Sequence, residues 1–228
     1  MNNQIKIRNI IKKYEKNKTI KVLNDISFNF ESGKIYSIVG PSGSGKSTLL
    51  NLLSLIDTPS SGTIEINNSK INFENKIIND NIRAKKIGII YQDKNLLSDF
   101  SAVENVYLPN LLLSNDHFSS MNLAKKIIKN IGLSSRLNHF PSELSGGENQ
   151  RIAIARALIN NPEIILADEP TGSLDFDNAK QIFKILLNLK NKNRIVIFAT
   201  HNRYFANMAD CKIKMIGGKM KISNERFN

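Results

Sequence analysis

The segment from Gly40 to Thr48 has the residue types and spacing of a phosphate-binding loop, Gly40-x4-Gly45-Lys46-Ser47. Glycines let the backbone curl so that successive N–H groups point at phosphate oxygens, and a helix that starts there presents its positive end to the same anion. We expect Lys46 to neutralise the outer phosphates and Ser47 to ligate Mg²⁺, which prefers oxygen ligands. The residues expected to hold the nucleotide phosphates are Gly40, Pro41, Ser42, Gly43, Ser44, Gly45, Lys46, Ser47 and Thr48.

Two carboxylates end a later apolar run, Ile164-Ile-Leu-Ala-Asp-Glu. Asp168 is expected to hold Mg²⁺ through water, and Glu169 to polarise the water that attacks the γ-phosphate. Gln92 follows another apolar run and is expected to reach the metal or the water. His201 is expected to donate to the terminal phosphate and to keep Glu169 in register. Together these residues predict Mg²⁺-dependent hydrolysis of a nucleoside triphosphate.

A second anion-binding pattern, Leu144-Ser-Gly-Gly-Glu148, precedes a predicted helix. Ser145 and the N–H groups of Gly146 and Gly147 would face an anion at the start of that helix. One chain rarely needs two such sites for one triphosphate. A head-to-tail homodimer explains both, with the phosphate loop of one copy facing Ser145 to Gly147 of the other. Nucleotide would then join the subunits, and hydrolysis would weaken their contact.

Strands and helices must hold these residues in position. The patterns of apolar residues predict strands that alternate with helices. Such alternation is typical of an α/β fold whose mostly parallel sheet carries helices on its faces. Residues 93–160 are predicted to be a helical insertion, and the polar stretch 67–83 carries no predicted element. The predicted strands are 4–11, 26–31, 34–39, 63–66, 87–91, 163–168, 194–199 and 211–216, and the predicted helices are 46–56, 121–131, 148–160, 175–189 and 203–209.

Composition narrows the class of protein. The chain has 228 residues, of which 41% are hydrophobic, and these suffice for one large domain with a sizeable core. Its net charge is +12, but the lysines are scattered, so no direct nucleic-acid surface is expected. The single Cys211 cannot form an internal disulfide, which suits a reducing cytosol. We expect neither a signal segment nor a membrane span, so a membrane role would need a partner.

The order of these motifs resembles the ATP-binding subunits of ABC transporters over essentially the full length. The resemblance implies a P-loop NTPase cassette with a RecA-like core sheet, an N-terminal antiparallel β subdomain and an inserted helical subdomain. It implies one domain, 1–228, with its core in 1–92 and 161–228 and the helical signature subdomain in 93–160. It also implies that Tyr14 stacks on adenine and that Ser173-Leu-Asp175 crosses the dimer interface. Asn149 and Ser173 depart mildly from the family's pattern.

Within that family the chain is most similar to lipoprotein-releasing ATPases, in a subgroup shared with macrolide exporters and cell-division ATPases. The segments that carry this likeness are 55–62, 91–92, 96–106 with Pro109, 138–144 and 175–179. The likeness implies release of lipoproteins from the bacterial inner membrane, driven from its cytoplasmic face by a peripheral ATPase. It implies integral membrane subunits, LolC/LolE-like, that dock near residues 93–110.

The sequence leaves two points open. Leu96, Leu97 and Phe100 either form an apolar groove for a partner's helix or fill the core of the helical insertion. The alternatives to lipoprotein release are a drug or peptide exporter, a cell-division complex that transports nothing, and a soluble ATPase acting on DNA or ribosomes.

Overall fold

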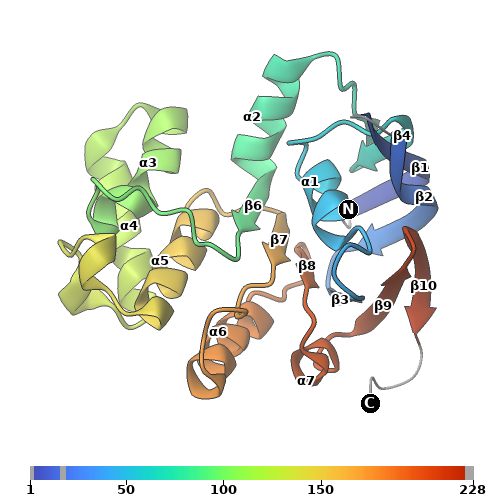
Figure 1. Cartoon of the computed structure of the whole chain (residues 1–228). Helices are drawn as coiled ribbons and strands as arrows, with labels where there is room; N and C mark the ends of the chain where they lie inside the picture. Colours follow the sequence, from blue (N-terminus) through green and yellow to red (C-terminus); the bar gives the residue numbers. More distant parts are fainter. Residues whose placement is uncertain (1–2, 16–18, 224–228) are drawn as a thin grey trace.

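A computed structural model describes residues 3–15 and 19–223. The N-terminal part is an antiparallel sheet in the order β2-β1-β4-β5, at one side of the molecule (Figure 1). Its long strands alternate apolar and polar residues, and Ile5, Ile7 and Ile10 are buried. Its strands are β1 (Gln4–Glu15), β2 (Thr19–Glu31), β4 (Ser61–Ile66) and β5 (Ser69–Lys70).

The second sheet has the order β10-β9-β3-β8-β7-β6, and its neighbouring strands are parallel except for β9 and β10. β3 and β8 are buried along their whole length, as expected for parallel strands covered on both faces. The strands are β3 (Ile35–Val39), β6 (Ile87–Ile90), β7 (Ile164–Asp168), β8 (Ile195–Ala199), β9 (Cys211–Ile216) and β10 (Lys219–Ser223).

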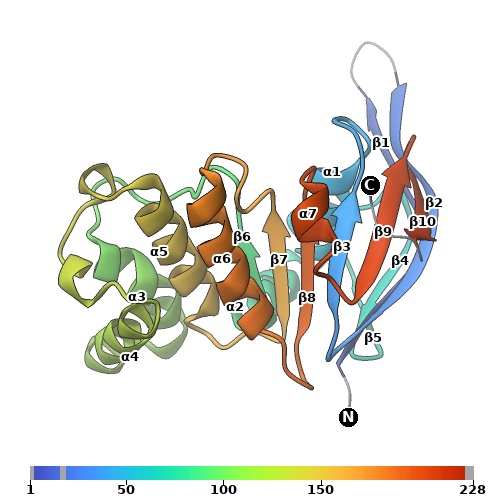
Figure 2. The ribbon, with the colours of Figure 1, turned by 90° about the horizontal axis from the view of Figure 1, so that it is seen from below.

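Helices cover both faces of this sheet (Figures 1 and 2). α1 (Lys46–Leu53) and α2 (Lys76–Lys86) lie on one face, where α1 buries four leucines, Leu49, Leu50, Leu52 and Leu53. α6 (Phe176–Asn188) and α7 (Arg203–Ala206) lie on the other. There Phe183 of α6 stacks on Phe205 of α7 with ring centroids 4.0 Å apart.

The chain between β6 and β7 is helical and has a core of its own. It contains α3 (Ala102–Ser114), α4 (His117–Asn130), single 3₁₀ turns at Ser134–Arg136 and Pro141–Glu143, and α5 (Gly146–Leu158). Val106, Ile128 and Ile152 are fully buried and join the three helices. This helical part lies on the side of the parallel sheet away from the N-terminal sheet (Figure 2).

The structure confirms the predicted fold class and corrects several elements. β1 and β2 extend well beyond 4–11 and 26–31, and β10 was not predicted. α2 lies in the polar stretch 67–83 and just beyond it, where no element was predicted. It packs on the core mainly through Ile82, while Ile77 and Ile78 are exposed, so it lacks a clear apolar stripe. Among the described residues no helix combines the length and the apolar character needed to cross a bilayer.

Candidate functional site

The candidate site lies at the carboxyl edge of the parallel sheet. β3 leads into Gly40, β6 leads toward Gln92, β7 ends at Asp168, and β8 leads into Thr200 and His201. Because the carboxyl ends of parallel strands share one edge, four segments distant in sequence meet there. This edge is where open α/β sheets bind ligands.

The backbone of the phosphate-binding loop admits only glycine at two positions. A Cβ on Gly40 would lie 2.3 Å from the carbonyl oxygen of Met215, which is backbone and cannot yield. Gly45 has a φ of +101°, and its Cβ would lie 2.7 Å from Cδ2 of Leu23. The loop therefore keeps its shape only with these glycines.

Lys46 is the first residue of α1, and its side chain is buried. Its Nζ donates to the carbonyl oxygens of Gly40 (2.8 Å) and Pro41 (3.1 Å), so the ammonium group lies against the loop itself. Ser42 and Gly43 are exposed at the tip, whereas Ser44 is buried. The loop thus combines a buried cation, a helix N-terminus and curled backbone, which is the arrangement that binds phosphate.

Asp168 ends β7 beside the phosphate loop. Burial raises the pKa of its carboxyl, and a hydrogen bond with Ser47 opposes that rise. Oδ1 of Asp168 is buried and has no hydrogen-bond partner. A buried carboxylate oxygen without a partner, next to a hydroxyl, fits a hard cation such as Mg²⁺. Within residues 3–15 and 19–223 no three His, Cys, Asp or Glu side chains cluster to hold a metal alone. Phosphate oxygens and water would complete the coordination.

Glu169 follows with a φ of 43°, a left-handed conformation that is unusual for a residue with a side chain. Its N–H donates to the carbonyl oxygen of Ala199 (3.0 Å), and its own carbonyl accepts from Gly172 (3.0 Å). Oε2 lies 3.0 Å from Nδ1 of His201, whose side chain is 69% exposed against 12% for Glu169. The turn therefore aims the carboxylate at His201, and both line a cavity of about 260 Å³ with Thr200 and Gly172.

Gln92 also lies beside this turn. A Cβ built on Gly172 would be 3.4 Å from Nε2 of Gln92 and 3.5 Å from Cβ of Glu169. The structure thus brings together Lys46, Ser47, Asp168, Glu169, His201 and Gln92, at the ends of four strands.

Arg156 is a candidate site residue that the sequence did not single out. It is on α5, and its guanidinium donates to the carbonyl oxygens of Asn95 (2.6 Å) and Lys94 (2.7 Å). Nζ of Lys94 in turn donates to Oγ of Ser173 (2.8 Å). The loop after Gln92 is therefore tied to the helical part and to the segment after Glu169. The sequence of α5 does not distinguish Arg156 from an arginine that only faces solvent, so the sequence carries no signal for this role.

Ser145 caps α5, where its Oγ accepts from the N–H of Glu148 and its own N–H donates to Oε2 of Glu148 (2.8 Å). Ser145 and Gly146 are exposed, while Gly147 is buried against Asn178 at the start of α6. Figures 1 and 2 both show α5 and α1 on opposite sides of β6 and β7. Within one chain, the structure does not bring Ser145, Gly146 and Gly147 to the phosphate loop.

Glu148 gives a pH prediction for the start of α5. The hydrogen bond from Nε of Arg136 (2.9 Å), with those from Ser145, lowers the pKa of Glu148 to about 2. The ordinary value is 4.5, so the carboxylate stabilises the fold above about pH 4.5 and loses that contribution as the pH falls toward 2. We expect Glu148→Gln to lower the melting temperature at pH 7. The difference from the unsubstituted protein should shrink in thermal scans between pH 4.5 and pH 3, and a constant difference would contradict the ion pair.

Tyr14 lies on β1 near the phosphate-binding segment. Its hydroxyl donates to Oδ2 of Asp57 (2.7 Å), and the residue is 40% exposed. Burial and the Asp57 hydrogen bond raise the pKa of this phenol, while the Thr48 side chain is close enough to act in the opposite direction. An exposed aromatic ring beside the loop is suited to stack on a base.

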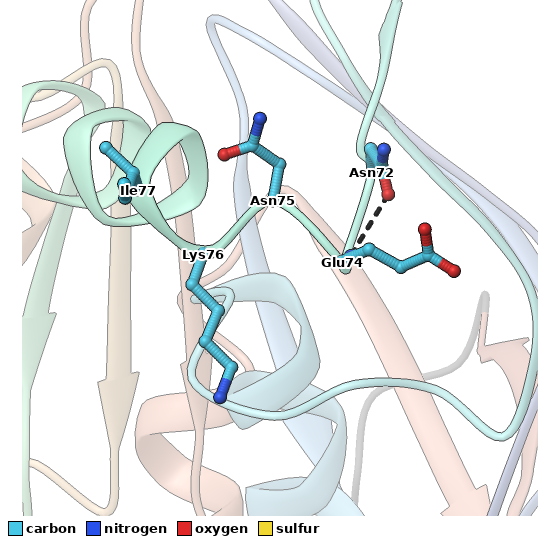
Figure 3. A pocket seen from close by; sticks show the side chains of 5 residues that line it. All are labelled: Asn72, Glu74, Asn75, Lys76 and Ile77. Atoms are coloured by element: carbon cyan, nitrogen blue, oxygen red, sulfur yellow. Dashed lines mark hydrogen bonds between the residues drawn. The ribbon is translucent and has the colours of Figure 1, made fainter.

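A cavity of about 410 Å³ lies at the start of α2 and is lined by Asn72, Glu74, Asn75, Lys76 and Ile77, whose side chains are drawn in Figure 3. Its polar side chains do not converge, because Lys76 and Glu74 extend in different directions from the turn. The N–H of Glu74 donates to Oδ1 of Asn72 (3.0 Å), which closes the turn itself. This cavity gathers no catalytic set comparable to that at the sheet edge.

Comparison with known proteins gives one consistent result. Residues 23–172, more than half of the chain, match the family model described as ABC transporter. The chain is 41% identical over 226 residues to the lipoprotein-releasing system ATP-binding protein LolD of Rickettsia bellii, covering 98% of this chain and 100% of that protein. It is 43% identical over 229 residues to LolD of Wigglesworthia glossinidia brevipalpis, with the same coverage.

Solved structures agree with the relatives. A dimeric, post-hydrolysis structure of the ATP-binding cassette MJ0796 bound to ADP and Pi has a TM-score of 0.89 and 35% identity, covering 98% of this chain and 99% of that one. A second dimeric structure of MJ0796, a bacterial ABC transporter cassette, has a TM-score of 0.88 and 37% identity, covering 95% and 96%. The phosphate loop, the paired carboxylates and these likenesses lead to one conclusion: the chain belongs to the ABC transporter family.

Proposed function

We propose that the chain is the ATP-hydrolysing subunit of a membrane ABC complex. The observation that carries the proposal is the group at the sheet edge, where the phosphate-binding loop lies beside Asp168 and the next residue, Glu169, contacts His201. Tyr14 stacks on adenine, the segment Gly40 to Thr48 cradles the phosphates, and Lys46 neutralises their charge. Glu169 takes the proton of the attacking water, and His201 holds Glu169 and donates toward the γ-phosphate.

Mg²⁺ would be held by Ser47, Asp168 through water, and Gln92, together with phosphate oxygens of the nucleotide. When bound, it offsets the charge that develops on the transferred phosphate. The side chains of Ser47 and Asp168 are joined by a hydrogen bond, and the side chain of Gln92 lies beside Gly172 in the turn that follows Glu169. Oδ1 of Asp168 is buried without a hydrogen-bond partner, so a bound cation would compensate for its lost hydration.

We propose that two copies form a homodimer around the nucleotide. Ser145 and Gly146 are exposed, and α5, which they begin, lies on the opposite side of β6 and β7 from α1, the helix that follows the phosphate loop (Figure 2). A second copy in head-to-tail orientation would bring its Ser145, Gly146 and Gly147 to the γ-phosphate. MJ0796, to which this chain is similar, is described as dimeric. Nucleotide is then buried between subunits, and hydrolysis releases them.

We further propose that the chain is one ABC ATP-binding domain, with its core in 1–92 and 161–228 and a helical subdomain in 93–160.

Membrane subunits of the LolC/LolE type would dock near residues 93–110. Leu96 packs on the helical core, but Leu97 and Phe100 are 42% and 37% exposed. Buried Asn105 fixes this loop, because its amide bonds the backbone of Leu97 in both directions and the carbonyl of Phe100. A fixed, partly apolar surface suits a partner's helix.

The cargo follows from the relatives, which are named for lipoprotein release. The chain would act at the cytoplasmic face of the bacterial inner membrane and drive lipoproteins toward the outer membrane. The test is depletion of the chain in its own cell. We expect outer-membrane lipoproteins to accumulate in the inner-membrane fraction. Correctly sorted lipoproteins together with sensitivity to macrolides, or with filamentous cells, would instead indicate an exporter or a division complex.

A further inference from the structure

A carboxylate outside the phosphate-binding loop and the Ser145–Gly147 motif holds the ring of Tyr14. Oδ2 of Asp57 accepts the hydroxyl of Tyr14 at 2.7 Å, and Oδ1 accepts Nζ of Lys12 at 2.6 Å. Asp57 lies in the loop that follows α1, where its own N–H donates to the carbonyl of Asn51. The carboxylate therefore connects the end of the phosphate-loop helix to strand β1.

Lys12 completes this arrangement. Lys12 and Tyr14 are two residues apart on β1, so their side chains are on the same face of the strand. Nζ of Lys12 is 4.7 Å from the centroid of the Tyr14 ring and also donates to the carbonyl of Thr58 (2.7 Å). The side chain of Lys12 is 11% exposed and that of Asp57 is 25% exposed, so solvent screens the pair only in part.

The arrangement fixes the ring in one orientation while leaving 40% of the residue exposed. The ammonium group of Lys12 lies over the Tyr14 ring, and Asp57 accepts a hydrogen bond from the hydroxyl of that ring. Hydrogen bonds from Lys12 and Tyr14 hold the pKa of Asp57 below its ordinary value although burial opposes this, so the carboxylate stays charged at neutral pH. A ring that is already fixed loses less conformational entropy when a base stacks on it.

We propose that Asp57, together with Lys12, is a positioning residue for nucleotide binding: it holds Tyr14 in the orientation that accepts the base. This inference rests on the proposed function, since it requires Tyr14 to stack on adenine. Asp57 itself does not touch the nucleotide. Substitution of Asp57 should therefore weaken the binding only of ligands that carry a base, and only while the Tyr14 ring is present. It should not change how tightly the phosphates are bound.

The test compares two ligands of different make-up, ATP and inorganic tripolyphosphate, which lacks a base. We expect Asp57→Ala to raise the Kd and KM for ATP about 5-fold, as for one lost hydrogen bond, with kcat within about 2-fold. The Kd for tripolyphosphate should be unchanged. Tyr14→Phe removes only the hydroxyl and should weaken ATP binding in the same way, so it carries the test if Asp57→Ala does not fold.

A double-mutant cycle separates positioning from a structural role. In a Tyr14→Ala background, Asp57→Ala should cause no further loss of ATP affinity. Glu31→Ala is the matched control, because it removes an exposed carboxylate paired with Lys34 just before the amino end of β3, and it should leave both affinities unchanged. Equal weakening of ATP and tripolyphosphate by Asp57→Ala, or an unchanged affinity for ATP, would overturn the inference. An unsubstituted protein that binds ATP no better than tripolyphosphate would overturn the base site itself, and the inference with it.

Discussion

Glu169→Gln should bind ATP as the unsubstituted protein does but lose turnover by about 10²-fold or more, as expected when a general base is removed. The amide keeps the size of the side chain and can still accept from Nδ1 of His201, which is 3.0 Å from Oε2. It cannot take a proton from water. Steady-state phosphate release and equilibrium binding of ATP measure the two effects separately.

Glu163→Gln is the matched control, because Glu163 lies five residues before β7 ends and its carboxylate accepts from Asn67 (2.7 Å), away from the sheet's carboxyl edge. It should hydrolyse ATP at a near-normal rate. Multiple turnovers at a near-normal rate by Glu169→Gln would refute the role of Glu169 as the base.

Lys46→Ala should abolish ATP hydrolysis, with a loss of about 10²-fold or more, because it removes the buried positive charge of the phosphate loop. Unlike Glu169→Gln, it should also weaken binding, and tripolyphosphate should be affected as strongly as ATP. The loop glycines stay in place, so the backbone N–H groups alone remain to hold the phosphates. Titration with each ligand gives the two affinities.

The control for Lys46→Ala is Lys125→Ala, which removes an exposed lysine of α4 in the helical part. It should leave binding and hydrolysis unchanged, which excludes a general effect of the chain's positive charge. Tight tripolyphosphate binding by Lys46→Ala would mean that the triphosphate is held elsewhere.

The sequence predicted the parallel core well because its strands are short apolar runs that lead directly into motifs. The phosphate loop depends on contiguous backbone, so nine consecutive residues suffice to predict it. The pairing of Glu169 with His201 was predicted too, because both follow strands of one parallel sheet. Short motifs at the ends of predicted strands were enough to predict these features.

Other features depend on contacts that no local pattern encodes. α2 has exposed Ile77 and Ile78 and begins at an Asn75 cap that accepts from Ile78, so tertiary packing rather than a periodic stripe decides it. The hydrogen bond between Tyr14 and Asp57 joins residues 43 positions apart. The contact of Arg156 with the loop after Gln92 spans 61 positions or more. Only the folded chain brings such partners together.

Whether ATP joins two copies of the chain is measured most directly by light scattering on Glu169→Gln, which holds ATP without consuming it. With saturating ATP and Mg²⁺ we expect twice the 25.6 kDa mass of one chain, and one chain's mass without nucleotide. Adding Ser145→Arg to the same variant should abolish the dimer, because it blocks the exposed start of α5. A species of 25.6 kDa that has ATP fully bound would contradict a nucleotide shared between subunits.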